Sequence, residues 1–282
     1  MRVQMLGLCR FSYLGGGGYQ VGHDSIDARR AFLYHPDRLA RRWFWFENVT
    51  LPAYLAQSDP DFTLVIMTGP DLPEPYLGKL HDLARDVAQI KLELIPPMEE
   101  HTAACMAAVA PHMDAKAEVI GHFRQDDDDA VAFDFIKQAR TDFALMRRLW
   151  RNRGRLCCDY SRGVILKGTG QGVTVEPWIV YNTGIAQPIY LPPELQRTAV
   201  HFQHWKVGLS MPNVMMTGPV MFARFLHHDN DSGAIGAGYR WPAEGENWEK
   251  LLAKRFRIDL AALDRGARGF GLPGAARPRW GT

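Results

Sequence analysis

The sequence predicts an α/β protein with a mostly parallel, twisted sheet flanked by helices and a β-rich second half. Short apolar runs that fit buried strands alternate with stretches of helical periodicity through the first half of the chain. From residue 156 the pattern changes to short strands and turns. The 282 residues are long enough to bury a substantial core.

Four apolar runs in the first half are the expected strands of the parallel sheet. They are Val3–Cys9, Phe62–Met67, Ile90–Ile95 and Glu118–Arg124. Helical patterns separate them at residues 37–57, 77–87 and 99–113, the first of which is rich in aromatic residues and interrupted near Pro52. A long helix is expected over 130–151, where apolar residues recur at helical spacing.

The second half is expected to be a β-rich lobe that packs on the parallel half. We therefore expect one domain over residues 1–265, divided into halves at 1–151 and 152–265. The Pro-, Gly- and Arg-rich segment 266–282 has little core potential and is expected to be a flexible or docking tail.

Composition excludes several classes of protein. The formal charge of +2, from 33 Lys and Arg against 31 Asp and Glu, argues against a general nucleic-acid-binding protein. The four cysteines form no CxxC pair or zinc spacing, which favours reduced thiols in a cytosolic protein. The sequence shows no signal peptide and no apolar run of ~20 residues. We expect a cytoplasmic protein without a transmembrane segment, with peripheral attachment at the inner membrane face left open.

The acidic run Asp126-Asp127-Asp128-Asp129 directly follows the fourth expected strand. Four adjacent carboxylates repel one another unless a cation or several donors neutralise them, and burying them unpaired is prohibitively costly. In an extended strand Asp126 and Asp128 would share one side, where they could hold Mg²⁺ or Mn²⁺ with a diphosphate. The other pair could bind sugar hydroxyls or the N-terminus of a helix starting near Ala130. The alternative is a solvated acidic turn that caps this helix.

Ligands of parallel α/β sheets bind beyond the carboxyl ends of the strands. Arg10, Thr68 and the acidic run each fall just after an expected strand, so they should lie along one edge of the sheet.

The segment 123–130, FRQDDDDA, resembles the DxD-bearing segment of bacterial proteins described as rhamnosyltransferases, which are glycosyltransferases expected to have the GT-A fold. Weaker similarities are Cys9-Arg10-Phe11, the segment YNTG at 181–184, and the segment LHHDN at 226–230. The resemblance is spread over most of the chain but consists of short matching segments. Departures are the four glycines at 15–18, and His228 where the family tends to have a small residue.

The resemblance implies a set of site residues. The donor nucleotide and its diphosphate would be bound by Arg10, Phe11, Thr68, Arg124, Asp126 and Asp127. A divalent metal, Mn or Mg, would be held by Asp126 and Asp128, with His227 as a third ligand because a neutral imidazole can complete a carboxylate site. The alternatives are an ordinary salt bridge for Arg10 and a surface histidine pair for His227 and His228.

An inverting transfer needs a base within hydrogen-bond reach of the acceptor hydroxyl. His204 and His201 follow the β-rich segment on the expected acceptor side, and their spacing places them together if this stretch is helical. Asp159, Glu176 and Asp229 are rival bases, and two half-buried structural histidines are the alternative reading.

The sequence therefore predicts a metal-dependent glycosyltransferase that moves a sugar, with rhamnose implied by the resemblance alone. The partners would be a nucleotide-sugar donor and a carbohydrate or glycolipid acceptor, and not a nucleic acid. Trp178, Tyr181 and Trp205 are candidates for stacking on a sugar. Two rival functions remain. A metal-dependent phosphohydrolase would need an aspartate nucleophile where this chain has Arg10 and Ser12, and a non-catalytic carbohydrate- or metal-binding protein would bind an ion without nucleotide.

Overall fold

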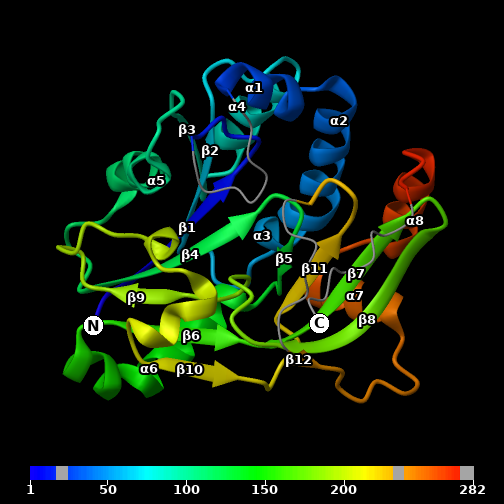
Figure 1. Cartoon of the computed structure of the whole chain (residues 1–282). Coiled ribbons are helices and arrows are strands. Elements are labelled where there is room, and N and C mark those ends of the chain that lie inside the picture. Colours follow the sequence, from blue (N-terminus) through cyan, green and yellow to red (C-terminus); the bar gives the residue numbers. More distant parts are fainter. Residues whose placement is uncertain (17–24, 231–237, 274–282) are drawn as a thin grey trace.

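The computed structural model describes residues 1–16, 25–230 and 238–273 (Figure 1). The strands are β1 (Val3–Arg10), β2 (Thr63–Thr68), β3 (Ile90–Leu94), β4 (Val119–Asp126), β5 (Ala130–Val131), β6 (Leu156–Tyr160), β7 (Arg162–Thr169), β8 (Gly172–Val180), β9 (Ile189–Leu191), β10 (Asn213–Met216), β11 (Phe222–Leu226) and β12 (Gly238–Tyr239). The α-helices are α1 (Ile26–Leu33), α2 (Pro36–Trp45), α3 (Leu51–Leu55), α4 (Tyr76–Asp86), α5 (His101–Val109), α6 (Phe135–Arg153), α7 (Trp248–Phe256) and α8 (Leu260–Gly269). A π-helix, η1 (Phe46–Thr50), and the 3₁₀ helices η2 (Ala110–His112), η3 (Ala199–His201) and η4 (His204–Leu209) complete the elements.

The larger sheet has the strand order β10-β6-β9-β4-β1-β2-β3. The adjacent strands β4, β1, β2 and β3 are parallel to one another, and β10 is parallel to β6. In this sheet of the described residues, β9 is antiparallel to both of its neighbours, β4 and β6. Each of the four predicted strands is present, with ends that differ by at most two residues. The mostly parallel α/β class is confirmed.

The second sheet has the order β12-β8-β7-β11-β5 and contains the long antiparallel pair of β7 and β8, which Figure 1 shows extending toward α8. Most of its strands come from the second half of the chain, as predicted. The strand β5 comes from the first half and pairs with β11, so it joins the two halves directly after the acidic run.

Strand register places the expected site residues along one edge. Arg10, the last residue of β1, is opposite Met67 of β2 and opposite Asp126 of β4. Because these three strands are parallel, their carboxyl ends meet here, and Thr68 ends β2 at the same level. The predicted shared edge is confirmed.

The backbone of the acidic run differs from the extended strand that the sequence suggested. The strand β4 ends at Asp126, Asp127 and Asp128 form a turn, and Ala130 begins β5. The long helix α6 begins only at Phe135, so the aspartates do not cap it. The reason lies in tertiary structure, because the edge of β11 accepts Ala130 and Val131 as an antiparallel neighbour.

The aromatic-rich helical segment forms α2, η1 and α3 in succession, and Pro52 lies in the first turn of α3, directly after the π-helix. Its Trp45 is fully buried and packs on Phe225 of β11 and His227, with ring centroids 4.6 and 5.6 Å apart. This packing lays α2 over the turn that carries the aspartates.

The segment expected as a tail from residue 266 begins inside α8. In the part that is described, Gly266 lies against the ring of Phe44, Leu272 is buried, and the Leu272 carbonyl accepts a hydrogen bond from Gly170. Residues 274–282, and Gly17 and Gly18 of the glycine-rich loop, lie outside the described residues. In the described ranges, no helix has the length and apolar character to cross a membrane.

Candidate functional site

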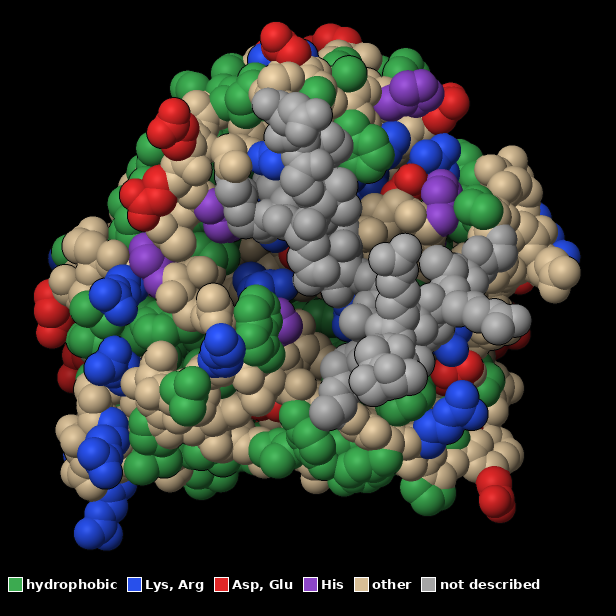
Figure 2. All heavy atoms as spheres, viewed as in Figure 1, with side chains coloured by type: hydrophobic (Ala, Val, Ile, Leu, Met, Phe, Trp, Pro, Cys, Tyr) green, Lys and Arg blue, Asp and Glu red, His purple; other side chains and the backbone are tan. Residues whose placement is uncertain are grey.

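The carboxylate of Asp126 lies between two arginines at the carboxyl edge of the parallel strands. Arg10 Nη2 is 3.7 Å from its Oδ1, and Arg124 Nη2 is 3.6 Å from its Oδ2. Its side chain keeps 36% of its surface exposed, whereas the other three aspartates are buried. Burial alone would raise the pKa of Asp126, but Arg124 and Arg10 outweigh it and lower that pKa. In Figure 2, Lys, Arg and His side chains gather around a hollow near the middle of the face shown.

Arg42 of α2 neutralises the next two aspartates. Its Nε donates to Asp127 Oδ2 at 3.2 Å, its Nη2 pairs with Asp127 Oδ1, and its Nη1 donates to Asp128 Oδ2 at 2.8 Å. All three side chains are buried, so the ion pairs are poorly screened by solvent. Burial raises the pKa of Asp128, yet Arg42 and the bond from His227 lower it well below its usual range.

His227 and Asn230 contact the same oxygen of Asp128 as Arg42 does. His227 Nε2 lies 3.0 Å from Asp128 Oδ2, and Asn230 Nδ2 donates to the same oxygen at 2.7 Å. His227 Nδ1 accepts the main-chain N–H of Asp229 at 3.2 Å. Burial lowers the pKa of His227, so the ring is neutral and carries its proton at Nε2, from which it donates to Asp128.

Asp129 belongs to the backbone framework of the site. Its Oδ1 accepts the main-chain N–H of Phe225 at 3.0 Å, and its carbonyl accepts hydrogen bonds from Thr50 and Gln125. Burial and the neighbouring Asp128 raise its pKa. These contacts tie the end of the acidic run to β11, η1 and β4 rather than to a ligand.

The two candidate bases lie in separate 3₁₀ helices and differ in environment. His201 ends η3, where its Nδ1 accepts the N–H of Thr198 at 3.1 Å in a capping box. His204 begins η4, and its Nδ1 hydrogen-bonds the carbonyl of Asn182. Burial and the charge of Arg124 lower the pKa of His204 to about 4. The neutral ring therefore carries its proton at Nδ1, which leaves Nε2 as the basic nitrogen.

Gly184 brings His204 and Arg124 together. A Cβ at this position would lie 2.9 Å from Arg124 Nε and 3.2 Å from His204 Cγ, and its φ is +81°. Only glycine tolerates both the close approach and the left-handed backbone without strain. The segment 181–184 thus joins the candidate base to the arginine beside Asp126.

Two of the expected nucleotide ligands are buried below the site. The side chain of Phe11 has no exposed surface and packs on Trp43 and Phe46, so any nucleotide contact by Phe11 can involve only its main chain. Thr68 is also fully buried, and its Oγ1 has no hydrogen-bond partner among the described residues. Asp127 is occupied by Arg42. Arg10, Arg124 and Asp126 are the members of the set that lie together at the edge.

The rival bases are held by other groups. Glu176 pairs with Lys167 at 2.8 Å and Arg240 at 3.2 Å, and Asp229 pairs with Arg41 at 2.6 Å. Asp159 is buried, and burial raises its pKa to about 6. Its Oδ2 accepts the N–H of Asn182 at 2.9 Å, which links it to the loop that holds His204.

Trp205 is the sugar-stacking candidate that lies beside the candidate base. It is 57% exposed, and its ring centroid is 4.8 Å from that of His204. Tyr181 instead contacts Tyr239, and Trp178 Nε1 donates to Glu176.

Sequence reasoning missed Arg42, and it noted the segment 181–184 for its resemblance to the family without assigning a role to Asn182 or Gly184. For Arg42 a signal was present, because Leu39, Arg42 and Phe46 recur at helical spacing along an apolar stripe. An arginine at such a position is buried and needs a carboxylate partner. For Asn182 and Gly184 the resemblance marked the segment but not their contacts, which are with residues distant in sequence.

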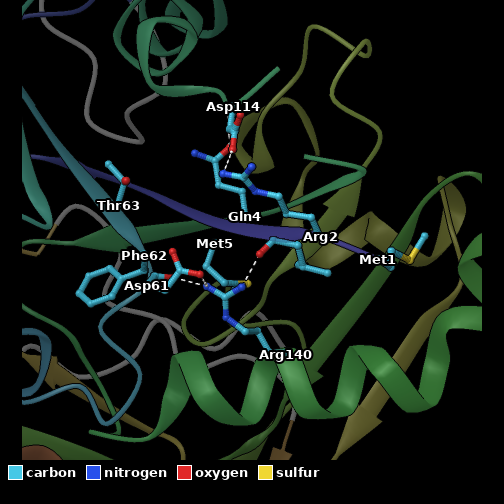
Figure 3. Close-up of a pocket in the computed structure, with 10 residues that line it drawn as sticks. Met1, Arg2, Gln4, Met5, Asp61, Phe62, Thr63, Asp114 and Arg140 are labelled. Carbon is cyan, nitrogen blue, oxygen red and sulfur yellow. Dashed lines mark hydrogen bonds and ion pairs between the residues drawn. The ribbon is translucent and has the colours of Figure 1, made fainter. Parts of the chain in front are cut away.

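A separate hollow of about 290 Å³ lies at the opposite, amino end of β1 and β2 (Figure 3). Arg140 of α6 reaches into it and binds Asp59, Asp61 and the carbonyl of Val3. These contacts tie α6 to the sheet. None of the predicted site residues lines this hollow.

Comparison with known proteins identifies the family. No curated protein sequence matches the chain. A structure of S. aureus TarS residues 1–349 matches with a TM-score of 0.43 and 11% identity over 79% of this chain and 60% of that one. The same protein in complex with UDP gives 0.38 and 12% over 80% and 61%. The chain thus spans about three fifths of the length of these structures. Both TM-scores are below 0.5.

The model of the family described as "Putative rhamnosyl transferase" matches residues 4–239, which is most of the chain. This range includes the acidic run, both candidate bases and the segment 226–230. The protein belongs to this family of glycosyltransferases.

Proposed function

We propose that this protein transfers a sugar, rhamnose by the description of its family, from a nucleotide-sugar donor to a carbohydrate or glycolipid acceptor with the help of a divalent metal. The observation that carries the proposal is the position of Asp126 between Arg10 and Arg124, at the carboxyl edge of parallel strands, with Arg124 and His204 both beside Gly184. All described cysteines are free thiols, which is in keeping with the cytoplasmic location expected from the sequence. Peripheral contact with the inner membrane face would fit a glycolipid acceptor.

The diphosphate of the donor would be bound by Arg10 and Arg124. Both guanidiniums are 3.6 to 3.7 Å from the Asp126 carboxylate, a separation at which each can turn toward a second anion. Guanidinium groups bind phosphate oxygens in pairs and keep their charge at any pH of interest. They would therefore stabilise the negative charge that develops on the leaving diphosphate.

The metal would be held by Asp126, Asp128 and His227. These residues suit a Mn or Mg ion in type, since two carboxylates and a neutral imidazole are suitable ligands, and Asp128 Oδ2 and His227 Nε2 lie 3.0 Å apart. The ligand atoms of the three residues do not all lie within 4.8 Å of one another, so Asp126 would have to approach the other two when the ion binds. The ring of His227 would have to give up the Nε2 proton that it now shares with Asp128. When bound, the ion would supply positive charge to the diphosphate oxygens.

His204 is the proposed base. The acceptor hydroxyl oxygen forms the new bond to the anomeric carbon while the bond from that carbon to the diphosphate breaks. The hydroxyl proton passes to His204 Nε2, and the diphosphate leaves with the bonding electrons. Attack opposite the leaving group inverts the anomeric centre, and Trp205 beside His204 offers a ring on which an acceptor sugar can stack.

The first test is calorimetry of the full chain with UDP, GDP and dTDP in the presence of Mn²⁺, followed by a screen of nucleotide-sugar hydrolysis. We expect one of the three nucleotides to bind and its sugar conjugates to be hydrolysed slowly. Ion binding without binding of any nucleotide would favour a non-catalytic metal-binding protein and reject the enzyme. Retention of the donor configuration, measured by NMR of the product anomer, would reject inversion.

A further inference from the structure

Arg42 lies where a cation would be expected. Its guanidinium contacts Asp127 through Nε and Nη2, contacts Asp128 through Nη1 at 2.8 Å, and places the same Nη1 3.4 Å from His227 Nε2. The helix α2 that carries it is fixed by the burial of Leu39, Trp43 and Trp45. The position of the guanidinium is therefore set by packing and is available before any ligand binds.

The charge of the acidic run is compensated by the chain itself. Arg42 serves Asp127 and Asp128, while Arg10 and Arg124 flank Asp126. The three ion-paired aspartates thus face three arginines. The repulsion that makes an acidic run demand a metal is already relieved in this arrangement.

Arg42 also blocks the proposed ion. Two of the atoms that would ligate it, Asp128 Oδ2 and His227 Nε2, are 2.8 and 3.4 Å from Arg42 Nη1. A divalent cation and a guanidinium at these distances repel each other strongly in a buried site. Because arginine does not lose its proton, lower or higher pH does not remove this conflict.

We propose that Arg42 is a built-in counter-cation of the acidic run, which keeps the site assembled without a metal and which the divalent ion must displace in order to bind. The inference rests on the metal ligands of the proposed function. It predicts that Arg42 weakens metal binding while it stabilises the metal-free protein.

The experiment measures Mn²⁺ binding by calorimetry and thermal unfolding in EDTA and in Mn²⁺, on the full chain and three variants. Arg42→Gln removes the charge, and Arg42→Lys keeps a charge without the planar fork. Arg255→Gln is the matched control, because Arg255 of α7 makes a two-pronged ion pair with Asp134 away from the acidic run.

We expect R42Q to bind Mn²⁺ at least about 10-fold more tightly than the native chain, with R42K between them. In EDTA, R42Q should unfold at a lower temperature than the native chain, and Mn²⁺ should restore most of the loss. R255Q should also lose thermal stability, but Mn²⁺ should not restore it. If R42Q does not fold in EDTA, the Mn²⁺ affinity of R42K relative to that of the native chain tests the role of Arg42.

Equal Mn²⁺ affinity in the native chain and both Arg42 variants would overturn the role of Arg42 and leave the metal proposal standing. No Mn²⁺ binding by any of them would overturn both this inference and metal dependence, while binding of UDP, GDP or dTDP in the same titrations would preserve the proposal of a nucleotide-sugar enzyme.

Discussion

His204 is oriented by Asn182, whose main-chain carbonyl hydrogen-bonds the Nδ1 of the ring. Asn182 adopts a left-handed φ of +53°, and its N–H is bound by the buried carboxylate of Asp159. Its side-chain oxygen accepts hydrogen bonds from Gln187 and Asn213. Asn adopts this conformation more readily than most residues with a side chain, and three partners fix it here.

The first prediction concerns the base. Replacing His204 by Gln should lower kcat by about 10²- to 10⁴-fold, the usual contribution of a general base, with little change in nucleotide affinity. His81→Gln, on the exposed face of α4, is the control and should leave kcat unchanged. Steady-state kinetics with the donor identified by the hydrolysis screen would measure both. A native rate in H204Q would remove His204 from the mechanism.

A second prediction separates His201 from His204. His201 accepts the N–H of Thr198 and completes the cap of η3, so His201→Ala should lower the free energy of unfolding by about 1 kcal/mol. Urea unfolding measures this loss. A fall in kcat of H201A as large as that of H204Q would show that His201 takes part in the proton transfer instead.

The buried carboxylate of Asp159, which accepts the N–H of Asn182, should lower the free energy of unfolding at neutral pH. Burial raises its pKa from 3.8 to about 6, so its stabilising contribution is complete below pH 3.8 and is lost as the pH rises through 6. Asp159→Asn keeps an oxygen for the Asn182 N–H without a buried charge. Its unfolding free energy at pH 8 should exceed the native value by up to about 3 kcal/mol. An equal or lower value would show that the native carboxylate is better compensated than its burial suggests.

His122 should make the protein sensitive to acid. It is buried in β4, and burial lowers its pKa from 6.5 to about 3. Between these two pH values the imidazole is protonated in the unfolded chain but neutral in the folded chain. The contribution of the neutral His122 to the free energy of unfolding is fully present above pH 6.5, and it falls by about 1.4 kcal/mol per pH unit between pH 6.5 and 3. Between pH 7 and 5, the free energy of unfolding of His122→Leu, measured by urea titration, should fall by about 2 kcal/mol less than that of the native chain. Parallel losses in the two proteins would contradict this.

Gly184 should contribute to nucleotide binding as well as to stability. Gly184→Ala forces a left-handed alanine and places its Cβ against Arg124 and His204. Gly154→Ala at the end of α6 is a matched control, because its φ is +71° and no described atom lies within 4 Å of the added Cβ. Both variants should lose about 1–2 kcal/mol of stability. Only G184A should also weaken nucleotide binding, measured by calorimetry.

The parallel strands and their shared edge could be predicted because their signals are local. Runs such as Phe62–Met67 are apolar throughout, as strands covered on both faces must be, and β2 occupies Thr63–Thr68. The placement of Arg10 beside Asp126 followed from parallel pairing alone. The turn at Asp127 and Asp128 could not be predicted, because it depends on the pairing of Ala130 with Ala223, which is distant in sequence.

The sequence by itself determined the α/β class, the edge at which the acidic run ends and, through the match over residues 4–239, the family. Only the tertiary structure decided which group each aspartate faces. Periodicity fixes the face of a strand or helix on which a residue lies, but not which distant side chain packs against it. Arg42 comes to Asp127 and Asp128 from 85 and 86 residues away because Trp45 packs on Phe225, and this contact is set by the folded core.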